Sequence, residues 1–173
     1  MKNLTKIFAT AAIIIAGTSV SFAQATATAS ASANIITPIS IAKTVDMNFG
    51  NVAVSATIAG TAILAPGGTR TTGGAGGVTL PATTGTVSAA SFTVSGQASY
   101  TYAITLPSTT VTLSSGTNTM GINTFTSSPS ATGLLSSGGT QTLTVGATLD
   151  VSAGQASGSY TNATAVPVTV NYN

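Results

Sequence analysis

Residues 142–151 have the sequence Thr-Leu-Thr-Val-Gly-Ala-Thr-Leu-Asp-Val, in which every second side chain is apolar. Successive side chains of a β-strand point to opposite faces of its sheet, so this period of two predicts a strand with one buried face. The polar residues Thr142, Thr144, Thr148 and Asp150 would lie on the opposite face. The buried face would consist of Leu143, Val145, Ala147, Leu149 and Val151.

Shorter segments with similar patterns lie along the rest of the chain. No segment keeps the 3.6-residue period of a helix, and β-branched Thr and Val are frequent. Turn residues such as Pro107-Ser108 and Ser115-Gly116 end several of the segments. We therefore expect an all-β protein, built as an antiparallel β-sandwich. The expected strands are residues 60–64, 91–94, 100–106, 110–113 and 120–126, with a glycine-rich loop at 66–77.

The end of the chain is expected to form the last strand. A turn at residues 153–155 would lead to a strand that contains Tyr160. Beyond it, one face carries Val166, Val168, Val170 and Tyr172 in alternation with polar residues. Pro167 has no N–H group to donate, which favours a position at a sheet edge over one at the centre.

Composition and charge exclude several classes of function. The chain has 173 residues, no Cys or His, and only 3% charged residues. Lys2 and Lys6 lie in a segment that we expect to be removed. The remaining charges are Lys43 and Arg70 against Asp46 and Asp150, so the mature net charge is 2 − 2 = 0. A neutral chain without a basic patch is not expected to bind nucleic acid or an anionic membrane, and it has little electrostatic protection against association.

Residues 1–23 have the features of a secretory signal peptide. Lys2 and Lys6 precede an apolar run at residues 7–16, and Ser21-Phe22-Ala23 supplies small residues at the positions that a signal peptidase recognises. The run is too short for an uncleaved membrane helix. We expect cleavage between Ala23 and Gln24, with secretion through the periplasm to the cell surface or the medium. No second apolar span follows, so no membrane span is expected in the mature chain.

Residues 24–34 form an N-terminal extension ahead of a single sandwich domain at residues 35–173. The apolar face of the extension consists of small residues: Ala25, Ala27, Ala29, Ala31 and Ala33. It continues in register to Ile41, about 55 Å in all at about 3.3 Å per residue. Two interpretations remain open. Either a flexible leader precedes an ordinary first strand at residues 35–41, or two strands follow in tandem and the first is available to a neighbouring subunit.

The chain has few of the residue types that catalysis usually needs. Without His or Cys the chain lacks the usual general base, nucleophile and soft metal ligand. Asp46 and Asp150 are the only side-chain carboxylates, and we expect both to lie in turns or on the solvent face. No Gly-Lys-Ser/Thr follows the glycines of residues 66–77, which argues against a nucleotide-binding loop. We expect no enzyme activity, no metal and no cofactor.

Four tyrosines allow a different interpretation. Exposed tyrosines can stack on sugars, so a carbohydrate-binding module is the main alternative from another class. A core position is favoured by the pattern, because Tyr100 and Tyr102 share the face of Ile104, and Tyr172 shares that of Val170. Tyr160 is the fourth.

Several stretches together resemble a known family. They are residues 39–50, 91–96, 102–107, 139–146, and 154–160 leading into 168–172. Over nearly the whole mature chain, and in order, they resemble the bacterial secreted family catalogued as domain of unknown function 4402. This resemblance implies a secreted bacterial domain without an established activity. Ser157-Gly158-Ser159-Tyr160 followed by an alternating terminal strand is also similar to subunits of chaperone–usher pili and to the spore-coat U family.

The pilin-like resemblance implies an immunoglobulin-like sandwich that lacks one strand. In such subunits a neighbour's N-terminal extension fills the gap and adds its strand to the open edge. Here the resemblance makes residues 25–33, with their alanine face, the candidate donor strand. The candidate acceptor edge is Val166, Val168, Val170 and Tyr172. The chain departs from that pattern in having no disulfide and in its small donor residues, which bury less apolar area.

The expected function is that of a non-enzymatic, secreted structural protein. It would be a fimbria- or pilus-like or surface-coat subunit that associates with itself or with related surface subunits through β-strand addition. The alternative is a monomeric secreted adhesion or carbohydrate-binding module. Such a module would bind a glycan or a host or matrix protein through its loops, for example residues 66–77.

Overall fold

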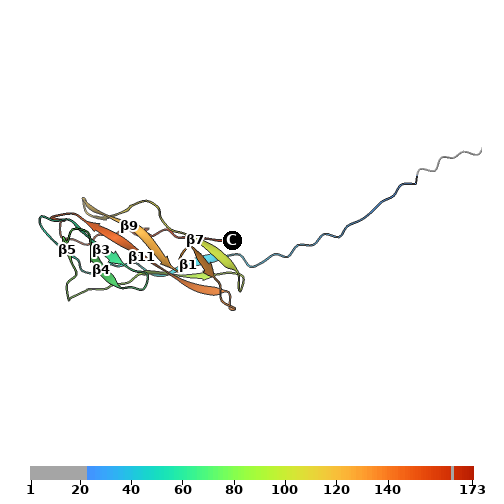
Figure 1. Cartoon of the computed structure of the whole chain (residues 1–173), viewed down its shortest axis with the longest axis horizontal. Helices are drawn as coiled ribbons and strands as arrows, with labels where there is room; N and C mark the ends of the chain where they lie inside the picture. The colour runs from blue at the N-terminus through green and yellow to red at the C-terminus, as the bar shows by residue number, and fades with distance from the viewer. Residues whose placement is uncertain (1–22, 165) are drawn as a thin grey trace, which may run out of the picture. The chain divides into compact units, whose positions relative to one another are not determined.

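The computed structural model describes residues 23–164 and 166–173, and the chain divides into two units, Met1–Ile35 and Ile36–Asn173. The predicted signal peptide falls almost wholly outside the described residues; Ala23 and Gln24, which flank the expected cleavage point, are exposed. All regular structure in the described residues is β-strand (Figure 1). The strands are β1 Ser40–Val45, β2 Ala53–Val54, β3 Gly60–Leu64, β4 Arg70–Gly73, β5 Val78–Thr79, β6 Ala90–Ser95, β7 Thr101–Thr105, β8 Val111–Ser115, β9 Asn118–Ser128, β10 Thr132–Leu134, β11 Thr140–Val151 and β12 Thr169–Tyr172.

The N-terminal extension forms no strand in the described part of the chain. Residues 23–35 are all exposed, and the Ile35 side chain is 94% exposed. The prediction of a first strand at residues 35–41 is wrong in its start, because β1 begins at Ser40, where pairing with Ser95 of β6 begins. Strand formation here follows the partner strand and not the apolar alternation, which runs on unpaired through the extension.

The main sheet is organised around β11. Its first half pairs with β6 and its second half with β3, while β9 pairs along the other edge. Gly146 lies at the changeover between β6 and β3, where an added Cβ would stand 2.1 Å from the carbonyl oxygen of Leu64. The backbone of the β3 segment can approach β11 this closely only because Gly146 has no side chain. The sheet continues outward through β1 beside β6, β4 beside β3 and β8 beside β9.

The buried face predicted for β11 is confirmed. All five apolar residues on it are at most 4% exposed: Leu143, Val145, Ala147, Leu149 and Val151. They belong to two core clusters. The first cluster contains Phe49, Ala62, Leu64, Val78, Ile122, Ala147, Leu149 and Val151. The second contains Ala90, Phe92, Val94, Tyr102, Leu135, Leu143, Val145 and Val170.

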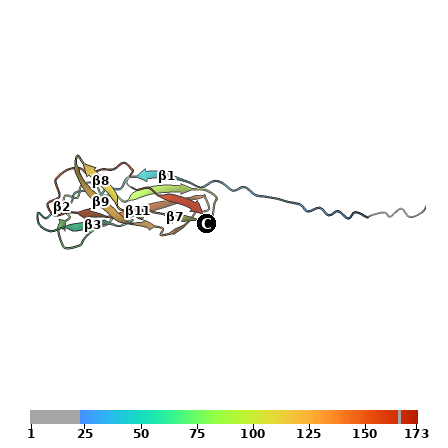
Figure 2. The same ribbon diagram turned by 90° about the horizontal axis from the view of Figure 1, so that it is seen from above.

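A three-stranded sheet in the order β10-β7-β12 contributes Tyr102 and Val170 to the second core cluster. Figure 2 shows β7 near the C-terminus, with β2, β3, β8 and β9 toward the other end of the domain. The small β2–β5 pair is a separate sheet. All pairings are antiparallel, and the predicted all-β antiparallel sandwich is confirmed.

Three local predictions need correction. The loop at residues 66–77 contains β4, which pairs with β3 because its Thr-rich sequence follows a tight turn. Tyr160 lies in no strand, since only an isolated bridge joins the adjacent Thr161 to Ser114. Tyr100 is 44% exposed and precedes β7, whereas Tyr102 is fully buried.

Candidate functional site

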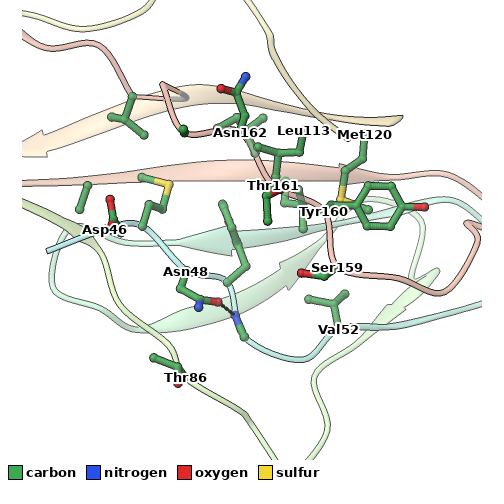
Figure 3. A pocket seen from close by; sticks show the side chains of 18 of the residues that line it. Asp46, Asn48, Val52, Thr86, Leu113, Met120, Ser159, Tyr160, Thr161 and Asn162 are labelled. Atoms are coloured by element: carbon green, nitrogen blue, oxygen red, sulfur yellow. Dashed lines mark hydrogen bonds between the residues drawn. The ribbon is translucent and has the colours of Figure 1, made fainter. Parts of the chain in front are cut away.

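A groove of about 1470 Å³ opens onto the hydrophobic core. Its floor is the inner face of the main sheet, with Phe92 of β6, Ile122 of β9 and Leu149 of β11. These three residues are members of the two core clusters. Leu113 of β8 and Met120 of β9 extend the floor, and Figure 3 shows them beside Tyr160. The floor of the groove therefore consists of core residues, whereas its walls also carry polar residues such as Asn51, Ser157 and Ser159.

The first wall runs from Thr37 through β1 to Ser55, and the part of it that lines the groove begins at Lys43. The N–H and C=O of Asn48 both bond Ser88, at 2.8 and 2.9 Å. In an extended chain the neighbouring residues, Met47 and Phe49, direct their backbone groups the opposite way. β1 itself pairs only with β6, so its second edge has no partner strand in the described residues.

Arg70 fixes the same wall from outside the groove. Its Nη1 donates to the carbonyl oxygen of Phe49 and, at 2.8 Å, to that of Asn51. Asn48 Oδ1 accepts the N–H of Gly50 at 2.8 Å, which is the dashed line in Figure 3. A single guanidinium thus stabilises the bend at residues 49–51.

The second wall is the irregular segment that leads to β12. Thr161 exchanges two backbone hydrogen bonds with Ser114, of 3.0 and 3.1 Å, and Asn162 Nδ2 donates to the carbonyl oxygen of Thr112 at 2.8 Å. The Tyr160 hydroxyl accepts from Gln155 Nε2 and donates to the carbonyl oxygen of Ala156, both at 2.8 Å. The wall is therefore bound to β8 at Ser114 and Thr112, to β9 through Gln155 and Thr119, and is otherwise held by its own side chains.

The two walls run in opposite directions and are joined at both ends. At one end the Tyr172 hydroxyl donates to the carbonyl oxygen of Thr37 at 2.7 Å. At the other end the Gly154 N–H donates to the carbonyl oxygen of Ser55 at 2.9 Å. Between these joins, both walls line the groove without a ladder of hydrogen bonds between them in the described residues.

The predicted acceptor residues lie along the second wall and β12. Val170 is buried, Val166, Val168 and Tyr172 are half-buried, and Pro167 is exposed. β12 pairs with β7 on one side and is the last strand of its sheet, which is the edge position expected from Pro167. Of the predicted set, Val166 lines the groove directly, while the other three pack against the second core cluster.

The rim of the groove is electrically balanced. Lys43 and Asp46 are the charged side chains among its lining residues, and they form an ion pair with each other. Both are well exposed, at 54% and 78%. The groove therefore offers no net charge to attract a charged ligand.

The two carboxylates are not brought together in one pocket. Asp46 lines the groove, whereas Asp150 accepts a hydrogen bond from Asn123 and lines a separate small pocket beside Gly74. In the part of the chain that the structure describes, no group of three or more His, Cys, Asp or Glu residues is placed to hold a metal ion. No described helix is long and apolar enough to cross a membrane.

The tyrosines divide between core and surface. Tyr102 is fully buried, and burial raises the pKa of its hydroxyl, which donates to Gln141 Oε1 at 2.7 Å. The exposed Tyr100 ring meets the edge of the Tyr172 ring, with centroids 5.9 Å apart. The core position expected for Tyr100 is therefore wrong, because it lies just before the register of β7 begins.

Sequence reasoning identified β12 but missed the first wall and the join at Thr37. The available signal for the wall was Met47 and Phe49, which share a face next to Gly50. The join had no local signal, since Thr37 and Tyr172 are 135 residues apart.

The family comparison covers both walls and the floor. A family model described as domain of unknown function (DUF4402) matches residues 39–172. No curated protein and no solved structure matches the chain. The matched region begins just before β1 and ends at Tyr172, the last residue of β12, so the N-terminal extension lies outside it. The chain belongs to the family of the domain of unknown function DUF4402.

Proposed function

We propose that this protein is a secreted, non-enzymatic structural subunit of a bacterial surface fibre or coat, and that it assembles by β-strand addition. The observation that carries the proposal is the groove, whose floor consists of core residues such as Ile122 and Leu149. An apolar interior left open between two strand edges is stabilised by an added strand, which buries the floor and bonds the free edge of β1.

The N-terminal extension has the properties of that added strand. Residues 23–35 are exposed and unpaired in the described chain, and they carry no charged side chain. Residues 25–33 span about 30 Å at about 3.3 Å per residue, which lies within the range of lengths that strands reach. Their alanine face is uncharged, like the groove with its paired Lys43 and Asp46. Each alanine buries little area, so affinity would come largely from backbone hydrogen bonds along the edge.

The predicted signal peptide at residues 1–23 supports secretion through the periplasm to the cell surface. The mature net charge of zero (2 − 2 = 0) also suits a protein whose surface is covered by its neighbours. The partners would be other copies of this chain or related surface subunits.

The test compares material sheared from producing cells before and after boiling, on a denaturing gel. The full chain should give a ladder that collapses to one band only on boiling, because a strand held by many bonds dissociates slowly. A deletion of residues 24–34 should give a single monomer band in both lanes. A ladder that persists in this deletion variant contradicts the proposed donor strand.

A matched pair of substitutions sharpens the result. Ala29→Asp would place a charge on the face that enters the groove and should abolish the ladder. Thr28→Asp changes the opposite face of the same strand and should leave most of the ladder intact. Equal effects of the two substitutions would show that the extension does not bind as a strand with one buried face.

A monomeric adhesion or carbohydrate-binding module is the second candidate. Tyr100 favours it, because an exposed ring braced by Tyr172 is a surface on which a sugar can stack. The partner would be a glycan or a host or matrix protein. A glycan array probed with the monomer should then show binding that Tyr100→Ala abolishes.

A further inference from the structure

Beyond one end of the groove, the two walls are joined by three residues that we call the Thr37 clasp: Thr37, Gln97 and Tyr172. The Tyr172 hydroxyl accepts the Gln97 N–H at 2.6 Å and donates to the carbonyl oxygen of Thr37 at 2.7 Å. Gln97 Oε1 in turn accepts the Thr37 N–H at 3.3 Å. Both backbone groups of Thr37 are therefore occupied by the clasp.

The surroundings of the clasp are shaped to hold it. A Cβ added at Gly96 would stand 2.3 Å from the Tyr172 hydroxyl, so the phenol fits only because this residue is glycine. The Tyr100 ring packs against the Tyr172 ring at an interplanar angle of 70°. These contacts fix the position of the hydroxyl between the start of the first wall and the end of β12.

The clasp lies where the domain's own extension would have to enter the groove. The extension joins the domain at Ile36, one residue before Thr37. To fill its own groove it would have to fold back there and run along the free edge of β1 toward Val45. Such a fold-back would have to turn at Thr37, whose N–H and C=O groups the clasp already holds. Pro38 follows with no N–H, and it restricts Thr37 to extended conformations.

A strand from another molecule meets no such obstacle. It approaches across the open face of the groove and need not begin beside Thr37. Resting on the proposed function, we infer that the Thr37 clasp bars the extension from its own groove, so that the occupant is residues 25–33 of a second copy. The clasp thereby favours assembly between molecules, because it prevents the extension from filling the groove of its own molecule.

The absence of cysteine from the chain allows a direct test by disulfide trapping. One cysteine replaces Ala29 of the extension and a second replaces Val45, which lines the groove and is 43% exposed. Both are introduced into the full mature chain, with and without Tyr172→Phe. This last substitution keeps the ring but removes both hydrogen bonds of the hydroxyl.

With the clasp intact, oxidation should give disulfide-linked ladders whose yield falls on dilution. With Tyr172→Phe, the ratio of internal to intermolecular disulfides should rise at least about tenfold, the change expected from the loss of the two hydrogen bonds of the hydroxyl. Tyr100→Phe is the control, because the Tyr100 hydroxyl makes no hydrogen bond in the described residues. It should leave the ratio unchanged.

The outcomes separate the two proposals. An unchanged ratio in Tyr172→Phe, or internal disulfides that already dominate with the clasp intact, overturns the role of the clasp while strand addition stands. If neither double variant is trapped more than the single-cysteine chains, the extension does not enter the groove at all. That result overturns the proposed function, and the role of the clasp with it.

Discussion

Tyr102 of β7 and Gln141 of β11 join the two layers of the sandwich through a hydrogen bond of 2.7 Å between the phenol and Oε1. The same Oε1 accepts the N–H of Leu134 in β10 at 2.9 Å. One amide oxygen thus holds β7 and β10 of the three-stranded sheet to β11, the central strand of the main sheet.

Tyr102→Phe should lower the free energy of unfolding by about 1 kcal/mol. The substitution removes one hydrogen bond but leaves Gln141 Oε1 bonded to Leu134, so no acceptor is left unpaired. Urea titration of the two proteins measures the difference, with Tyr100→Phe as the control on an exposed hydroxyl. A loss equal to that of the control would show that the bond between the layers adds no net stability.

The free energy of unfolding should fall at alkaline pH because the Tyr102 hydroxyl loses its proton. Burial raises the pKa of this hydroxyl above the ordinary value of 10.0, so the unfolded chain loses the proton first. The stabilisation that Tyr102 contributes is complete below about pH 10 and is lost as the pH rises through the pKa of its hydroxyl in the folded state. Unfolding free energies measured across this range should decline less steeply in Tyr102→Phe. If the unfolding free energy declined equally steeply with pH in both proteins, Tyr102 would not be the cause of the decline.

Gly146→Ala should prevent stable folding or reduce the yield of folded protein severely. The new methyl group would lie 2.1 Å from the carbonyl oxygen of Leu64, and the backbone there cannot move without breaking the changeover between β6 and β3. Gly67→Ala is the matched control, because nothing lies within 4 Å of its added Cβ. Circular dichroism and thermal melting distinguish the two, and a normal melting curve for Gly146→Ala would refute the prediction.

Arg70→Lys should destabilise the domain by about 1–2 kcal/mol. Both carbonyl oxygens, of Phe49 and Asn51, accept from the one nitrogen Nη1 at the tip of Arg70, which the shorter lysine side chain would not reach in the same position. Denaturant unfolding measures the loss. Because these residues belong to the first wall, binding of a donor peptide should weaken as well. Unaltered stability would mean that water satisfies the two carbonyl groups equally well.

A synthetic peptide of residues 24–34 should stabilise the domain that lacks its own extension. A ligand that binds only the folded state adds about 2.7 kcal/mol at a hundred times its dissociation constant, so the melting temperature should rise with peptide concentration. The same peptide with Asp in place of Ala29 should have no effect. Equal stabilisation by both peptides would exclude binding through the alanine face.

The strands that could best be predicted from the sequence are those whose position depends least on which strand they pair with. The five apolar residues of β11 alternate so regularly that strand, face and burial follow from the period alone. The start of β1 and the presence of β4 were missed because pairing with β6 and β3 decides them, and pairing is not a local property. Tyr100 and Tyr102 share a sequence face, yet only Tyr102 lies within a paired strand.

The candidate site was less predictable than the fold. The alternation of Val166 to Tyr172 predicted a terminal strand, of which β12 covers only Thr169–Tyr172, and its role as an acceptor edge stays a prediction. The walls of the site are irregular segments held by contacts such as Thr37 with Tyr172 and Ser55 with Gly154. Such contacts join positions that are distant along the chain, and no periodicity records them.

The joining of the groove walls at both ends has a mechanical consequence for the proposed fibre. A strand seated between Thr37–Tyr172 and Ser55–Gly154 would lie along the direction in which the chain is pulled. Tension would then load all of its backbone hydrogen bonds in shear at once, and they could not open one after another as in a peeled hairpin. Resistance to stretching would come from the orientation of the strand, although each alanine contributes little.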